Sequence, residues 1–324
     1  MNLIIVEGIP GSGKSTTARF IALQSERNGF KTKLYHESTF EHPIIMQNSI
    51  SNYTNWMDDY VSNWDKFLED HTGDETTFVL ESVLFQTPIL YLLHKDIDRD
   101  EIVQFIEKIY SRLSDMNCRL IFLFQNNPWV GINRMMEARG GKNWLNHTYE
   151  KYKHEPYYIN RDQGNAEVHL EFLNEYAQIA HTAYIRSEIN TIAIDNTEWD
   201  WTEYHSRLHD YLRWTYYPDQ IIPISELKKY SGLYHSDEIN LNLIIEIKDN
   251  ELIIFGDQRL KPKEQYKFYL DSISIVVSFM PSPSGKFDQL LIEEKDLVGN
   301  HKEEGTRFVR VSEKTDDKEV THGS

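Results

Sequence analysis

Short apolar runs alternate with longer amphipathic segments from residue 2 to about residue 215. Five of these runs are rich in β-branched and aromatic residues, as in the strands of a buried parallel sheet: 2–7, 32–37, 77–82, 119–124 and 190–195. Between them, apolar residues recur at helical spacing in 16–27, 55–69, 101–113 and 168–186. The alternation predicts an α/β fold, with a parallel sheet and helices on both faces.

The pattern changes after Pro218 and Pro223. Short runs of alternating apolar and polar residues follow, separated by turn-forming residues: 231–236, 242–248, 251–256, 266–270, 272–279, 287–293 and 306–311. This spacing is typical of an antiparallel barrel or sandwich. We therefore predict an α/β domain over 1–218, a β-rich domain over 219–312 and a flexible tail over 313–324.

Composition and charge narrow the possible partners. The 324 residues include one cysteine, Cys118, so no intramolecular disulfide can form, and its apolar surroundings favour an unreactive core thiol over a reactive one. The net charge of -17 would repel a phosphate backbone, so binding to nucleic acid is not expected. We find no signal-peptide pattern and no apolar run long enough to span a bilayer. A cytoplasmic protein without a membrane partner is expected.

A phosphate-binding motif, GxxxxGK[ST], stands between the first predicted strand and the first predicted helix. In such a loop, glycines let backbone N–H groups face an anion, the lysine reaches the β- and γ-phosphates, and the hydroxyl after it binds Mg²⁺. The sequence therefore predicts that ATP and Mg²⁺ bind here. The predicted nucleotide-binding residues are Gly8, Ile9, Pro10, Gly11, Ser12, Gly13, Lys14, Ser15 and Thr16.

The loop alone does not distinguish a kinase from a GTPase, a motor or a transporter ATPase. The chain contains no NKxD motif of GTPases and no LSGGQ motif of transporter ATPases. A kinase would further need a base for the acceptor hydroxyl, an acidic group near the metal, and a cationic lid.

Three features meet those needs. Glu37 ends the second predicted strand and Glu81 ends the third, and the carboxyl ends of parallel strands meet at one edge of a sheet. We predict Glu37 as the base and Glu81 as a group that binds Mg²⁺, directly or through water, or orients the substrate. The alternative is that both are solvated strand ends or helix caps. After the fourth strand, Arg134, Arg139 and Lys142 flank a glycine pair, which predicts either a hinged cationic lid or an exposed helix end.

Together these motifs resemble the nucleoside and nucleotide kinases of the P-loop superfamily, in particular the deoxynucleoside kinase and thymidylate kinase branch, over residues 1–215. The resemblance makes Glu37 similar to the base of deoxynucleoside kinases and Glu81 similar to the acid of their acid-Arg-Ser motif. The arginine of that motif is absent here. The resemblance also places Asp195 and Asn196 near the adenine ring, through backbone contacts; the alternative is a turn that caps the next helix.

The acceptor is less well defined. The predicted helix 55–69, with the residues just before it, has one aromatic face. This face could pack in the core or stack on a base. Its residues are Tyr53, Trp56, Tyr60, Trp64 and Phe67. Asp58, Asp59 and Asp65 make the same helix acidic, which favours a nucleoside, a sugar or an amino-bearing acceptor over a nucleotide. His36 and His42 are six residues apart and precede Pro43, which does not match the HExxH spacing of a zinc site.

The β-rich segment resembles small lipocalin-like barrels that follow bacterial enzymes. It contains no cluster suited to catalysis, so it could cover the site, bind a ligand, form a homodimer or simply stabilise the chain.

We therefore expect an ATP- and Mg²⁺-dependent P-loop kinase that phosphorylates a hydroxyl of a small molecule. Its predicted catalytic residues are Lys14, Glu37, Arg134 and Arg139, and its predicted metal ligands are Ser15 and Glu81. The alternative is a nucleotide-dependent switch or binding module with weak ATPase activity. A zeta-toxin-like kinase acting on a nucleotide sugar is a third hypothesis.

Overall fold

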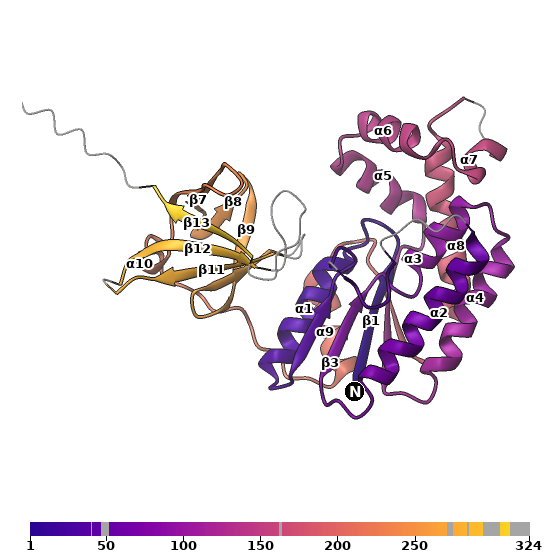
Figure 1. Cartoon of the computed structure of the whole chain (residues 1–324), viewed down its shortest axis with the longest axis horizontal. Helices are drawn as coiled ribbons and strands as arrows, with labels where there is room; N and C mark the ends of the chain where they lie inside the picture. Colours follow the sequence, from indigo (N-terminus) through magenta and orange to yellow (C-terminus); the bar gives the residue numbers. More distant parts are fainter. Residues whose placement is uncertain are drawn as a thin grey trace, which may run out of the picture. The chain divides into compact units, whose positions relative to one another are not determined.

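The computed structural model describes residues 1–39, 41–46, 52–161, 164–270, 275–283, 285–293 and 305–311. The chain divides into two compact units after Tyr217. The first is an α/β unit and the second is a β-barrel (Figure 1). The predicted fold class is thus confirmed for both parts. The predicted tail, 313–324, lies outside the described residues.

A five-stranded parallel sheet with the order β2-β3-β1-β4-β5 forms the centre of the first unit. Its strands are β1 (Asn2–Gly8), β2 (Thr32–Tyr35), β3 (Thr77–Glu81), β4 (Cys118–Phe124) and β5 (Asn190–Asp195). All neighbouring pairs are parallel, and Val6 of β1 is in register with Glu81 of β3 and Ile121 of β4. The carboxyl ends of all five strands therefore lie at one edge of the sheet.

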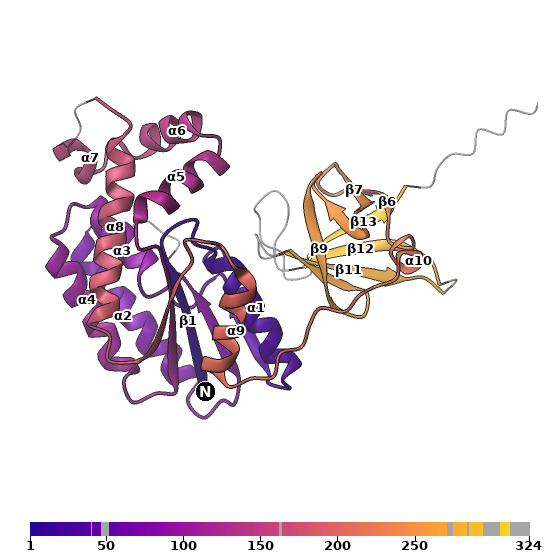
Figure 2. The ribbon, with the colours of Figure 1, turned by 180° about the vertical axis from the view of Figure 1, so that it is seen from behind.

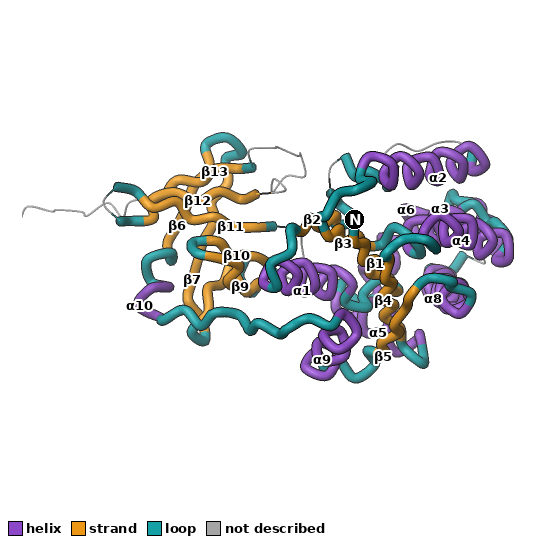
Figure 3. Tube along the Cα trace, turned by 90° about the horizontal axis from the view of Figure 1, so that it is seen from below, coloured by secondary structure: helices purple, strands orange, loops and turns teal. Residues whose placement is uncertain are grey.

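Helices cover both faces of this sheet, as the alternation predicted. Figure 3 shows the strands as a row, with α1 and α9 on one side and α2, α4 and α8 on the other. Alternate residues of β1 serve the two faces, because Ile4 and Val6 pack with α1 and α9, whereas Leu3 and Ile5 pack in the opposite core. The helices of this unit are α1 (Lys14–Arg27), α2 (Tyr53–Asp70), α3 (Gln86–His94), α4 (Arg99–Leu113), α5 (Pro128–Ala138), α6 (Lys142–Tyr152), α7 (Pro156–Arg161), α8 (Val168–Ile185) and α9 (Trp201–Leu212).

The segment that was predicted to be a lid forms α5 and α6, which lie beyond the carboxyl ends of the strands (Figure 2). Asn127 caps α5 by accepting a bond from Trp129 N, and Pro128 occupies its first turn. The helix ends at the glycine pair, where Gly140 has φ 108° and Gly141 has φ 61°. Such angles suit glycine and stop one helix before the next begins.

The aromatic face of α2 packs in the core. Trp56, Tyr60, Trp64 and Phe67 are each at most 3% exposed, so they are not free to stack on a bound base. The acidic residues of the helix face solvent, and Asp65 pairs with Arg112 at 2.8 Å. The core interpretation of the stripe is therefore correct, and the acidity of this helix gives no information about the acceptor.

The second unit is a closed barrel with the strand order β10-β11-β12-β13-β6-β7-β8-β9. Aromatic side chains, including Tyr234, Phe268, Phe279 and Phe308, fill its core. A ligand inside the barrel would have to displace this packing. Its elements are α10 (Ile224–Leu227), β6 (Gly232–Ser236), β7 (Leu241–Lys248), β8 (Glu251–Ile254), β9 (Gln258–Glu264), β10 (Lys267–Tyr269), β11 (Val276–Pro281), β12 (Phe287–Glu293) and β13 (Thr306–Arg310).

The pattern missed β9, because its sequence QRLKPKE is mostly polar and contains a proline. Within the ranges that the structure covers, we find no helix with the length and apolarity needed to cross a membrane.

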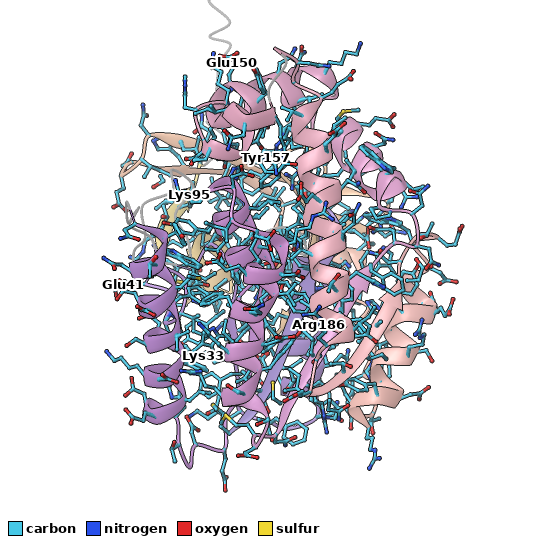
Figure 4. The ribbon with its side chains drawn as sticks, turned by 90° about the vertical axis from the view of Figure 1, so that its right-hand side faces the viewer. Lys33, Glu41, Lys95, Glu150, Tyr157 and Arg186 are labelled. Carbon is cyan, nitrogen blue, oxygen red and sulfur yellow. The ribbon has the colours of Figure 1, made fainter. Side chains whose placement is uncertain are left out.

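A stack of buried and half-buried rings joins α6 and α7 to α3 and α8. His94 lies 4.4 Å, between ring centroids, from both Tyr152 and Phe172, and Tyr158 Oη is 2.7 Å from His169 Nδ1. Figure 4 looks onto α8, which runs from the level of Tyr157 down toward Arg186. Burial lowers the pKa of His94 to about 3 and that of His169 to about 4. Both histidines are therefore neutral near pH 7.

We predict that these two histidines lower the stability of the first unit as the pH falls below 6.5. The unfolded chain then binds protons at these histidines while the folded chain does not, so each lowers the free energy of unfolding by about 2–3 kcal/mol between pH 6.5 and 4.5. Urea unfolding followed by tryptophan fluorescence would measure this, because all seven tryptophans precede residue 218.

His94→Phe should keep the ring stacking and reduce the pH dependence by about 2 kcal/mol over that interval. His147→Phe, at an exposed position of α6, is the matched control and should leave the dependence unchanged. A slope in His94→Phe equal to that of the wild type would contradict the assignment.

Candidate active site

The phosphate loop connects β1 to α1 in a tight turn. Ser12 N donates to Ile9 O at 3.0 Å, and the Lys14 ammonium donates to the same carbonyl at 3.0 Å. Gly11 and Gly13 have φ of 80° and 86°, a backbone conformation that favours glycine. Helix α1 begins at Lys14, so its first N–H groups are available to an anion at the loop.

Two neighbouring helices pack directly against the glycines of the loop. A β-carbon on Gly11 would lie 2.8 Å from Met135 Cγ of α5, and one on Gly13 would overlap the Trp201 ring of α9. The glycines are therefore required by close packing as well as by their φ angles. The helix that begins the lid segment is in contact with the loop that the lid is predicted to cover.

Ser15 and Glu81, the two predicted metal ligands, are in direct contact. Ser15 Oγ donates to Glu81 Oε1 at 2.7 Å, and Glu81 is 1% exposed. Burial raises the pKa of Glu81, while His36 and Lys14 oppose this shift. Hydroxyl and carboxylate oxygens suit a hard cation such as Mg²⁺, so these two residues fit the role of holding it. When bound with a nucleotide, Mg²⁺ neutralises negative charge on the phosphates.

His36 is part of this group, and sequence reasoning missed it. Its Nε2 lies 3.1 Å from Glu81 Oε2 and 3.3 Å from Ser15 Oγ. His36 directly follows β2, which is the neighbour of β3 in the sheet. It therefore gives Glu81 a basic partner, in a place where no arginine follows Glu81 in the sequence. The available signal was that His36 lies near the end of the second predicted strand. The sequence analysis compared this histidine only with the HExxH pattern of a zinc site.

Glu37 lies near the loop, but not at the end of a strand as predicted. Strand β2 ends at Tyr35, and Glu37 is an exposed residue of the following turn, where it accepts a hydrogen bond from Gln86 Nε2. The strand was predicted too long because His and Glu continue its alternation in the sequence. Glu37 nevertheless lies within electrostatic reach of Lys14.

Lys14 is the charge around which the site is arranged. The residue is buried, which lowers the pKa of its ammonium, whereas Glu37, Glu81 and Glu7 raise it. Arg139 acts in the opposite direction. Three acidic residues and one arginine, each from a different segment, therefore lie within electrostatic reach of the lysine of the phosphate loop.

Glu7 is the second functional residue that sequence reasoning missed. It is fully buried near the end of β1, where its carboxylate accepts from Leu84 N at 2.5 Å and from Gln86 N at 3.1 Å. Burial raises its pKa to about 7, while these N–H donors and Lys14 oppose the shift. Glu7 thus holds the turn after β3 against the phosphate loop. A glutamate inside an otherwise apolar strand was the available signal.

The two predicted lid arginines lie in different places. Arg134 Nη2 donates to Thr197 O at 3.1 Å, and its Cζ lies 5.2 Å from the centre of the Trp199 ring. Arg139 lies 5.7 Å from the centre of the Trp144 ring and acts electrostatically on Lys14. Both side chains are exposed. The two arginines therefore contact different segments, Arg134 the loop after β5 and Arg139 a ring of α6.

Asn196 contacts the phosphate loop through its side chain, whereas a backbone role was predicted. Its Nδ2 donates to Ser12 O, and its Oδ1 accepts from Gln125 Nε2 at 2.5 Å. Asp195 instead accepts hydrogen bonds from Thr197, as in a helix-entry turn. Asn196 is 1% exposed, so the loop after β5 is fastened to the loop after β1.

Cys118 is buried at the start of β4, and burial raises the pKa of its thiol to about 12. Such a thiol has little thiolate at neutral pH and is unreactive.

The first unit is thus a parallel α/β sheet with a phosphate-loop motif between β1 and α1, and a closed barrel follows it in the chain. Comparison with protein-family models and with curated proteins gave no match. Among solved structures, the chain is similar to the deoxyadenosine kinase of M. mycoides with bound dATP, at 16% identity over 66% of this chain and 100% of that one, with a TM-score of 0.40. It is also similar to the YorR protein of Bacillus subtilis in complex with phosphorylated GDP, at 14% identity over 65% and 96% of the two chains, with a TM-score of 0.38.

Proposed function

We propose that this protein is a P-loop kinase that transfers the γ-phosphoryl group of ATP to a hydroxyl group of a small molecule, with Mg²⁺. The observation that carries the proposal is the 2.7 Å contact between Ser15 of the phosphate loop and the buried Glu81. It joins the hydroxyl of the motif to a carboxylate on the neighbouring strand, which is the pair of oxygen ligands that Mg²⁺ bound to a nucleotide needs.

The remaining groups have complementary roles in this proposal. Lys14 and the loop N–H groups hold the phosphates, and Ser15 and Glu81 hold the cation. Glu37 accepts the proton of the acceptor hydroxyl as its oxygen bonds to the γ-phosphorus, while the bond from that phosphorus to the oxygen of the leaving ADP breaks. Arg139 approaches the transferring group when the lid closes.

The charge of the site favours an acceptor without phosphate groups. Glu7, Glu37 and Glu81 lie around Lys14, and all three oppose the lowering of its pKa. A phosphorylated acceptor would bring further negative charge to these carboxylates. We therefore propose a nucleoside, a sugar or an amino-bearing small molecule as the acceptor. This argument depends on Glu7 and Glu81 in β1 and β3 and on Glu37 in the turn after β2, and not on α2.

The proposal can be tested with γ-labelled ATP, Mg²⁺ and a panel of nucleosides, sugars, aminoglycosides and nucleotide sugars. A labelled product from an acceptor of the proposed classes supports the kinase, and Lys14→Ala should abolish it. Product from nucleotide sugars alone would support the zeta-toxin-like hypothesis instead. Tight ATP binding with no product from a broad panel would favour a nucleotide-dependent switch.

Replacing Glu37 by glutamine should lower the turnover number by about 10²–10⁴, because the amide cannot accept the hydroxyl proton. ATP affinity should change little, since the amide oxygen can still accept from Gln86. The matched control is Glu41→Gln, which changes an exposed glutamate of the same connecting segment. Turnover equal to that of the wild type would remove Glu37 from the role of base.

The two arginines should differ in steady-state kinetics. Arg139→Gln should lower kcat by about 10² with little change in the KM for ATP, because in this proposal its charge stabilises the transferring group. Arg134→Gln should raise the KM for ATP with kcat nearly unchanged, because it contacts the loop after β5. Lys108→Gln, at an exposed position of α4, serves as the control. The reverse pattern would contradict the separate roles.

A further inference from the structure

The candidate base, Glu37, has few contacts that hold its side chain in place. It is an exposed residue of the turn after β2. In the part of the chain that the structure describes, the one hydrogen bond to its carboxylate comes from Gln86 Nε2. An exposed glutamate without such a partner samples several rotamers. The position of this carboxylate relative to the phosphate loop therefore depends on Gln86.

The side-chain amide of Gln86 has a defined orientation. A carboxylate can only accept a hydrogen bond, so the amide must present Nε2 to Glu37. The oxygen of the same amide, Oε1, is buried. Packing around the oxygen and the hydrogen bond from the nitrogen thus hold the amide, as long as the backbone of Gln86 is also held.

Glu7 holds that backbone. Gln86 is the first residue of α3, and its N–H group has no acceptor within the helix. Glu7 Oε2 accepts from Gln86 N at 3.1 Å, and Glu7 Oε1 accepts from Leu84 N at 2.5 Å. Negative charge is favourable at this end of a helix. Because Glu7 is fully buried, water cannot replace either hydrogen bond.

Other side chains hold the carbonyl groups of the same turn. Tyr60 Oη donates to Val83 O at 2.5 Å, and Thr87 Oγ1 donates to Ser82 O at 2.7 Å. These bonds do not involve the N–H groups that Glu7 accepts. Removing the Glu7 carboxylate therefore releases the start of α3, while the contacts of the carbonyl groups remain.

We infer that Glu7 is a positioning residue for the candidate base: through the N–H group and the side-chain amide of Gln86, it holds Glu37 beside the phosphate loop. This inference rests on the proposed role of Glu37 as the base. Glu7 also acts electrostatically on Lys14. A role limited to balancing the charge of Lys14 would affect ATP binding instead.

The chain of contacts can be tested without turnover, through the side-chain amide resonance of Gln86 in the full chain with isotopically labelled glutamine. Gln86→Leu assigns this resonance by its loss. Burial raises the pKa of Glu7 to about 7, so spectra at about pH 8 report mainly on its carboxylate form. Glu37→Ala removes the acceptor and should move the resonance to the range of exposed glutamines such as Gln104.

Two changes at Glu7 should move the resonance in the same direction. Glu7→Gln leaves one acceptor oxygen in place of two, and Glu7→Asp keeps the charge near Lys14 on a side chain too short to reach both N–H groups. Glu175→Gln is the matched control, because this glutamate of α8 also accepts hydrogen bonds through both oxygens, and it should leave the resonance unmoved. An unmoved resonance in both Glu7 variants would overturn the inference.

Steady-state kinetics with an acceptor from the panel tests whether catalysis uses these contacts. Glu7→Gln and Gln86→Leu should each lower kcat about tenfold and change the KM for ATP less than about twofold, because they displace the base and leave the phosphate loop intact. The double variant should lose no more than either single variant, since both changes break one chain of contacts. Independent losses that multiply in the double variant, or a changed KM for ATP with unchanged kcat in Glu7→Gln, would overturn the positioning role.

The two experiments distinguish this inference from the proposed function. A moved resonance in the Glu7 variants without phosphorylation of any acceptor would confirm the contacts and overturn the kinase, and with it the role of Glu7 toward a base. An unmoved resonance in a protein that does phosphorylate an acceptor would overturn only the role of Glu7.

Discussion

The burial of the Lys14 ammonium is the constraint on which the rest of the site depends. A buried ammonium is costly unless opposite charge and hydrogen-bond acceptors surround it. Here the Ile9 carbonyl accepts one of its hydrogen bonds, and carboxylates from three segments lie within electrostatic reach. These carboxylates lie close to Lys14 because the parallel strands all end at the same edge of the sheet. The parallel direction of the strands therefore helps to stabilise the buried ammonium.

The same constraint explains which parts of the site the sequence could reveal. The phosphate loop is contiguous, so the φ angles of its glycines, its lysine and its hydroxyl are all encoded locally and were recognised. The fold class followed from hydrophobic periodicity for the same reason. His36 and Asn196 act through partners 45 and 184 residues away in the chain, and only the strand order brings those partners together.

Other errors have similarly local causes. Glu37 was predicted at a strand end because the alternation of apolar and polar residues continues past Tyr35, the last paired residue of β2. Where pairing stops depends on the neighbouring strand as well, and the sequence of β2 alone does not show it. The arginines Arg134 and Arg139 were treated as a pair because they are close in sequence. On a helix, five residues correspond to a rotation of about 500°, so side chains at this spacing point in different directions. The aromatic stripe of α2 could not be assigned from its own sequence, because its neighbours in the core decide whether it is covered.

The glycine pair between α5 and α6 separates two helices that pack on different parts of the protein. Met135 of α5 packs on Gly11 of the phosphate loop, whereas the rings of α6 and α7 stack with His94 and Phe172. The proposed lid cannot lift away as one rigid body without breaking one of these contacts. Bending at Gly140 and Gly141 would leave both contacts in place, and it would move Arg139, which directly precedes these glycines.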